Sequence, residues 1–165
     1  MKKVFYIFVV LIVIIIVLLI FGKKHISTEI MLNAPINKVW IELTDFSKYP
    51  EWNPFIRKVK GEIKKGNVIE VTFQIQGNEP FVFTPEIKLN EENDIFQWEG
   101  KLFLPGIFTG RHTFQLIKIE TNKTKLIQKE DFNGILVPFF SFESTIEGFN
   151  LMNKEFKKRI ENKLK

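Results

Sequence analysis

The feature that most constrains this chain is an unbroken apolar run near its N-terminus. Val4 to Phe21 reads VFYIFVVLIVIIIVLLIF, eighteen residues without a charged residue, glycine or proline. As a helix rising 1.5 Å per residue the run is about 27 Å long, close to the hydrocarbon thickness of a bilayer. Lysine pairs at 2–3 and 23–24 bracket it and can reach lipid headgroups. Isoleucine and valine cover every face, which favours a transmembrane helix over a buried core helix.

The alternative is a cleaved signal peptide, which has a shorter apolar region followed by a small-residue cleavage site. Here Phe21 is followed by Gly-Lys-Lys-His, without an A-x-A pattern. We therefore expect an uncleaved, single-pass anchor over residues 1–24, with the membrane contacted by residues 4–21. Two lysines lie on each side of the run, so the rule that positive residues stay on the cytoplasmic side barely determines which way the helix crosses the membrane. An extracytoplasmic domain is slightly favoured, because a translocated domain commonly follows such an anchor.

The anchor leaves residues 25–165 for one domain, long enough to bury a hydrophobic core. Cysteine is absent, which excludes disulfides, thiolate metal sites and a cysteine nucleophile. Of the 24 Lys and Arg, four flank the anchor, leaving 20 against 19 acidic residues in the domain. A nucleic-acid binder would be expected to concentrate its positive charge on the folded domain. Nucleic acid is therefore not expected as a partner.

Hydrophobic periodicity predicts the elements of this domain. A strand over 26–33 precedes Pro35, which suits the first turn of a helix over 36–43, and a second short helix follows. Alternating apolar residues then predict strands over 68–75, 81–89, 96–102, 108–119 and 123–132. The last two form a hairpin around Thr121-Asn122. A stripe of apolar residues predicts a long C-terminal helix over 139–164. One sheet and one such helix bury each other only if the sheet curls around the helix.

Several segments of the domain form a recognisable set: Ala34-Pro35 with Val39-Trp40, Leu43-Thr44-Asp45-Phe46, Tyr49-Pro50-Glu51-Trp52-Asn53-Pro54-Phe55, Trp98-Glu99-Gly100, Gly110-Arg111-His112, and Gln128 with Glu130, Phe132 and Gly134. Together with the C-terminal helix they resemble SRPBCC (START-like, polyketide cyclase-like) domains over nearly all of the chain after residue 25. The resemblance implies an α+β helix-grip fold, a curved antiparallel sheet of about seven strands around the helix, with a deep apolar cavity between them. Members bind lipids, sterols, polyketides, quinones or plant hormones, and a minority catalyse cyclisation or related chemistry. The family has no universal catalytic motif, so no catalytic residue is transferred, and the anchor departs from the usual soluble member.

The predicted ligand site is the inward face of the sheet and the facing side of the helix. Its residues are Trp52, Phe73, Phe83, Trp98, His112, Phe114, Gln128, Glu130, Phe132, Phe149 and Met152. For any single Phe the alternative is a tightly packed core. Gly148 removes a side chain where helix and sheet meet, which leaves room for a ligand or allows close packing on Trp98.

His112 is the most informative polar residue of this set. Strand parity points it inward, and the turn at Thr121-Asn122 places it opposite Glu130. Such a pair can orient a polar ligand group or act as an acid–base pair. The alternative is a purely structural hydrogen bond. The loop at 52–54 either forms a lip of the cavity mouth or packs its Trp on the sheet. The apolar loop at 103–108 either dips into the bilayer near the mouth or covers the end of the barrel.

These observations predict a membrane-anchored carrier or sensor for a hydrophobic small molecule or lipid. The alternatives are a cyclase/dehydratase-type enzyme using His112 or Glu130 as acid–base group, and a protein-binding module with a filled core. Binding is favoured over catalysis, because no feature requires a reaction. No cofactor or metal is expected, since His25 and His112 are the only histidines and lack ligand spacing.

Overall fold

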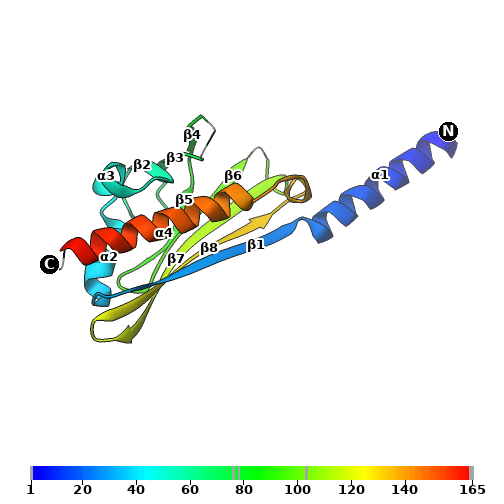
Figure 1. The fold of residues 1–165 in the computed structure, drawn as a ribbon. Helices are drawn as coiled ribbons and strands as arrows, with labels where there is room; N and C mark the ends of the chain where they lie inside the picture. Colours follow the sequence, from blue (N-terminus) through cyan, green and yellow to red (C-terminus); the bar gives the residue numbers. More distant parts are fainter. Residues whose placement is uncertain (1, 76, 78, 103, 164–165) are drawn as a thin grey trace.

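The computed structural model describes residues 2–75, 77, 79–102 and 104–163, except for the side chain of Leu19. The helices are α1 (Lys2–Phe21), α2 (Ile36–Thr44), η1 (Phe46–Lys48), α3 (Tyr49–Trp52), η2 (Val137–Phe139) and α4 (Glu143–Lys163). The strands are β1 (Lys23–Leu32), β2 (Ile56–Lys60), β3 (Glu70–Phe73), β4 (Phe81–Phe83), β5 (Glu86–Glu91), β6 (Ile95–Leu102), β7 (Phe108–Glu120) and β8 (Lys123–Asn133). Figure 1 shows α4 lying along the five-stranded sheet, while α1 projects away from the domain.

The strands form two antiparallel sheets, one with the order β1-β8-β7-β6-β5 and one with the order β2-β3-β4. The helix-grip architecture is confirmed, but the prediction of one sheet of about seven strands was wrong. The predicted strand 81–89 breaks at Thr84-Pro85, so that β4 pairs with β3 and β5 pairs with β6. Pro85 cannot donate a backbone hydrogen bond to a neighbouring strand, which favours a break there. The strand β2 is not among the strands predicted from the sequence.

The β7–β8 hairpin has the predicted register. His112 pairs with Glu130, and Phe114 pairs with Gln128. On the other side of β8, β1 places Thr28 opposite Gln128. The neighbouring strands β1, β8 and β7 therefore bring Thr28, Gln128 and His112 together beneath α4.

The core lies between α4 and the two sheets. The buried side of α4 presents Phe149, Met152, Phe156 and Ile160. This helix begins at Glu143 rather than at the predicted position 139, because the 3-10 turn η2 forms first, with proline in its first turn. The predicted last helical position, Leu164, lies outside the described residues.

The helix α1 follows the apolar run, and its apolar side chains from Val4 to Val17 are all exposed. Among the described residues, no helix meets the combined length and apolarity expected of a membrane span. Gly22 ends the helix, and its carbonyl accepts a hydrogen bond from Gly134 N at 2.8 Å. Lys23 and Lys24, which the sequence places in the anchor, are the first residues of β1.

Candidate functional site

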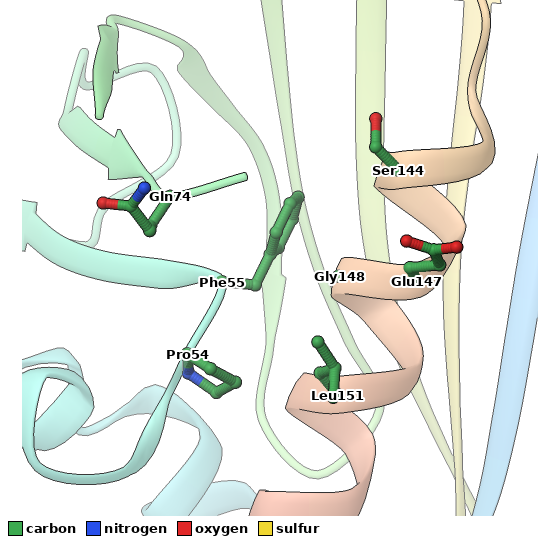
Figure 2. Close-up of a pocket in the computed structure, with 7 residues that line it drawn as sticks. All are labelled: Pro54, Phe55, Gln74, Ser144, Glu147, Gly148 and Leu151. Carbon is green, nitrogen blue, oxygen red and sulfur yellow. The ribbon is translucent and has the colours of Figure 1, made fainter. Parts of the chain in front are cut away.

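A pocket of about 220 Å³ opens between the three-stranded sheet and α4 (Figure 2). Its lining residues are Pro54, Phe55, Gln74, Ser144, Glu147, Gly148 and Leu151. Figure 2 shows the Phe55 ring directed toward Gly148, with Leu151 one turn further along the helix. The wall formed by Phe55 and Leu151 is apolar, and polar side chains of Gln74, Ser144 and Glu147 lie at its edges.

The Asn53-Pro54-Phe55 turn holds the Phe55 wall in place. The side chain of Asn53 is buried, and its Oδ1 accepts hydrogen bonds from the backbone N–H groups of Phe55 and Ile56, at 2.9 and 2.8 Å. Asparagine commonly closes turns in this way. The carbonyl of Phe55 accepts a hydrogen bond from Gln74 N at 2.8 Å. The turn is therefore tied to the strand that follows it and to the small sheet.

Gly148 lets Phe55 approach α4. A β-carbon at position 148 would lie 2.2 Å from Phe55 Cδ2, far inside van der Waals contact. Phe55 also contacts Phe73 and Phe149, with ring centroids 5.3 and 5.6 Å away. The close packing that the sequence allows for Gly148 is present, with Phe55 rather than Trp98 as the partner, and Gly148 also lines the pocket.

Four of the rings predicted to line a cavity, those of Trp98, His112, Phe114 and Phe149, are in direct contact with one another. The His112 ring stacks on Trp98, with centroids 4.9 Å apart and 16° between the ring planes. Phe114 and Phe149 meet the same imidazole at 4.5 and 5.0 Å. Trp52 contacts Phe156 at 5.0 Å. These rings fill the space beneath α4.

The remaining predicted aromatic residues lie toward the edges of the core. Phe132 contacts Phe108 and Phe142, at 5.5 and 4.3 Å. Phe83 is half-buried, and its ring occupies the space beside Gly100 of β6. None of the eleven predicted site residues is among the described residues that line the Phe55–Gly148 pocket. Contact between those eleven residues and a ligand stays a prediction.

A buried polar cluster surrounds His112. Its Nδ1 lies 3.5 Å from Glu130 Oε2, and its Nε2 lies 3.3 Å from Gln128 Nε2. Because an amide nitrogen only donates, these contacts fit the tautomer with the proton on Nδ1 and an acceptor at Nε2. Gln128 Nε2 also lies 3.5 Å from Met152 Sδ. His112 therefore lies opposite Glu130 as predicted, but among the described residues its buried Nδ1 has no hydrogen-bond partner, and its hydrogen-bonding neighbour is Gln128.

Asn153 belongs to the same region and was not found from the sequence. Its Nδ2 donates to Thr28 Oγ1 at 3.0 Å, across from α4 to β1. Within the described part of the chain, Asn153 Oδ1 and Gln128 Oε1 are buried without a hydrogen-bond partner. Each can accept a hydrogen bond from a water molecule or a ligand hydroxyl. A polar residue in a charged helix such as α4 gives no sequence signal of burial.

Among the described residues, no three His, Asp or Glu side chains are placed to hold a metal ion.

Comparison with known proteins agrees with this architecture. A family model described as polyketide cyclase/dehydrase and lipid transport matches residues 23–164. A START superfamily protein from Mycobacterium smegmatis has a TM-score of 0.65 at 19% identity, covering 84% of this chain and 97% of that chain. The major latex-like protein 151 of Panax ginseng has a TM-score of 0.68 at 14% identity, with coverages of 84% and 98%. The ZhuI aromatase/cyclase of Streptomyces sp. R1128 has a TM-score of 0.63 at 16% identity, with coverages of 87% and 96%. At such identities the structures establish the fold alone. No curated protein sequence gives a significant match.

Proposed function

Because the chain belongs to the polyketide cyclase/dehydrase and lipid transport family, we propose that it binds a lipid-like or aromatic small molecule in the Phe55–Gly148 pocket. The observation behind this proposal is the pocket itself, with its apolar wall and its polar edge. Such a lining suits an amphipathic molecule. Its apolar part lies against Phe55 and Leu151, and its polar group lies near Gln74, Ser144 or Glu147.

The size of the pocket limits what it holds. About 220 Å³ is below the range of roughly 300–1,000 Å³ that is usual for whole ligands. The pocket therefore admits one ring or a short length of acyl chain. Phe55 separates it from Phe73 and Phe149, two residues predicted from the sequence to bind ligand. A larger ligand would have to displace the buried Phe55 ring to reach them.

Native mass spectrometry of the full chain, released from detergent, tests binding. Leu151→Arg places a charge in the pocket wall at a position 41% exposed, so the fold tolerates it. Ile119→Arg is the matched control, at a strand position 43% exposed that does not line this pocket. We expect a small-molecule adduct on the wild type and on Ile119→Arg that is lost from Leu151→Arg. Equal adducts on both variants would overturn the proposal. They would show that the molecule is bound outside the pocket, as lipid held by α1 would be.

We further propose that α1 anchors the protein in a membrane. Its apolar side chains are exposed around the helix, and lysine pairs bracket the eighteen-residue run. Exposed apolar surface of this extent requires an apolar cover, which a bilayer supplies. The anchor would hold the domain where membrane-dissolved ligands are concentrated.

Membrane extraction tests the anchor. The full chain should stay in the membrane pellet after an alkaline carbonate wash. The double variant Ile12→Lys/Ile15→Lys puts two charges in the middle of α1 and should be released into the supernatant, because each charge at the bilayer centre costs about 3 kcal/mol. Release of the wild type by the same wash would contradict the anchor.

A cyclase/dehydratase-type activity is the second candidate, favoured by the placement of His112 Nδ1 3.5 Å from Glu130 Oε2. Binding is the better-supported function, because His112 is only 1% exposed and lies against Trp98, Phe114 and Phe149. A substrate atom would need those rings to move. For an enzyme, His112→Ala retains ligand binding and abolishes product formation. For a carrier, the same change weakens binding modestly, and there is no turnover to lose.

A further inference from the structure

Three segments meet at the end of the domain from which α1 emerges. Gly134 N donates to the Gly22 carbonyl, which fixes the β8–η2 connection to the end of α1. Ile135 N donates to the Gly106 carbonyl at 3.0 Å, and Leu136 N donates to the Ile107 carbonyl at 3.1 Å. These bonds join the β6–β7 loop to the same connection. In Figure 1 the η2 turn lies beside the start of β1, where α1 ends.

The side chains at this end are apolar and exposed. Leu104 and Phe139 are each 70% exposed, and Phe140 is 48% exposed. The segments 104–108 and 132–142, LPGIF and FNGILVPFFSF, contain no charged residue. A depression of about 310 Å³ beside Phe140 is lined by three charged residues, the exposed Lys23 and Lys24 and the acidic Glu143 at the start of α4, so its charge is positive on balance. We call Leu104, Phe139 and Phe140, with these two lysines, the α1-end surface.

We propose that the α1-end surface rests on an anionic lipid bilayer, with its apolar side chains inserted among the headgroups and its lysines on lipid phosphates. Exposed aromatic and aliphatic side chains beside basic residues match the chemistry of a bilayer interface. The surface is continuous with α1, whose last residue, Phe21, lines the same depression as Lys23 and Lys24. This inference rests on the proposed anchoring by α1. It adds that the domain is held against the membrane in one orientation, rather than suspended from it.

Depth-dependent fluorescence quenching tests this orientation. Because the chain has no cysteine, a single cysteine at position 12, 104, 139 or 122 can carry one fluorescent label in the full-length protein. The control, Asn122, lies in the turn at the far end of β7, about 40 Å from Phe108 at 3.3 Å per residue. The proteins are reconstituted into vesicles of phosphatidylcholine and phosphatidylglycerol. The quencher is a nitroxide, either on the headgroup or near the end of an acyl chain.

The expected pattern is strong quenching of the label at 12 by the deep nitroxide. The labels at 104 and 139 should be quenched by the headgroup nitroxide at least about twofold more than the label at 122. If 12 is quenched but 104 and 139 behave like 122, the anchor stands and the α1-end surface proposal is overturned. If 12 is not quenched by the deep nitroxide, the anchor fails and this inference fails with it.

Discussion

The ring of Phe55 occupies the space that a side chain at Gly148 would need, since a β-carbon there would lie 2.2 Å from Phe55 Cδ2. Phe55 is itself buried against Phe73 and Phe149. The ring therefore has little freedom to retreat into the core. Glycine at this position fixes both the distance between α4 and the small sheet and the shape of the pocket that opens beside them.

Gly148→Ala should destabilise the domain. Alanine gains about 1 kcal/mol of helix propensity over glycine. Overpacking a filled core costs about 1–3 kcal/mol, and the displaced atoms belong to a ring rather than to a flexible chain end. The overpacking cost is expected to exceed the gain, so the denaturation midpoint of the full chain in detergent should fall.

The double variant Phe55→Ala/Gly148→Ala isolates the clash. With the ring removed, Gly148→Ala meets no obstacle and should stabilise Phe55→Ala by up to about 1 kcal/mol. The sign of the Gly148→Ala effect thus reverses between the two backgrounds. The same sign in both would mean that Phe55 is not the neighbour that selects glycine.

His112 should contribute to stability more through its ring than through its nitrogens. His112→Ala removes the group stacked on Trp98 and leaves a cavity, with an expected loss of about 3 kcal/mol. His112→Phe keeps a ring there and removes only the contacts to Gln128 and Glu130, with an expected loss of about 1 kcal/mol. Urea denaturation of both variants measures the difference. Equal losses would assign the dominant contribution to the polar contacts.

The His112–Glu130 pairing illustrates what is readable from the sequence. Side-chain alternation sets which face a strand residue occupies, and one short turn sets the register of a hairpin, so both facts follow from local patterns. The C-terminal helix is similarly readable from its apolar stripe. The arrangement of these elements in a helix-grip fold was predicted from the resemblance to a known family.

Phe55 shows what the sequence leaves open. The residue lies at the end of a turn and precedes β2, a strand of five residues without clean alternation, so no periodic signal marks it. Its packing on Gly148 joins positions 93 residues apart (148 − 55). The division into two sheets depends on the break at Pro85. The segment before the break pairs with β3, and the segment after it pairs with β6. Such long-range choices leave no local pattern.

Glu42 should make stability depend on pH in the acid range. Partial burial raises the pKa of this carboxyl, but hydrogen bonds and charges from Lys163 and Arg159 outweigh it, so its pKa lies below the usual 4.5. A lowered pKa contributes stability that is present above the unfolded-state value and is lost as pH falls through the folded-state value. Arg159 also reaches Glu51, at 3.2 Å, so the network ties α2 and α3 to α4.

Glu42→Gln should therefore cost about 1–2 kcal/mol at neutral pH. The difference from wild type should shrink as the pH falls below about 4.5, where Glu42 of the unfolded chain begins to take up protons, and should be lost as the pH passes through the lower pKa of the folded state. Denaturation at a series of pH values measures it. The control is Glu29→Gln, whose partner Lys125 lies 3.3 Å away on a surface where Glu29 is 62% exposed. That exposed pair should contribute at most about 0.5 kcal/mol at any pH.

Tyr49 should limit stability at alkaline pH. Complete burial, and secondly the charge of Asp45, raise the pKa of the Tyr49 phenol well above 10.0. Its hydroxyl donates to the Leu43 carbonyl at 2.6 Å, near the end of α2. Because the pKa is raised, the contribution of the neutral Tyr49 phenol to stability is complete below pH 10. It is lost above pH 10, because the phenol ionises at a lower pH in the unfolded chain than in the folded one. Tyr49→Phe removes the hydrogen bond and should cost about 1 kcal/mol near neutral pH.

The gap between wild type and Tyr49→Phe should narrow as the pH rises beyond 10, since only the wild type has a phenol to ionise at this position. Tyrosinate absorbance provides a direct readout, because the chain has two tyrosines and the variant retains only Tyr6. The difference between the two titrations is the Tyr49 signal. It should stay flat until the domain unfolds and then rise together with the loss of circular dichroism. A rise near pH 10 in a domain that is still folded would show that the phenol is open to solvent and that the contact with Leu43 does not form.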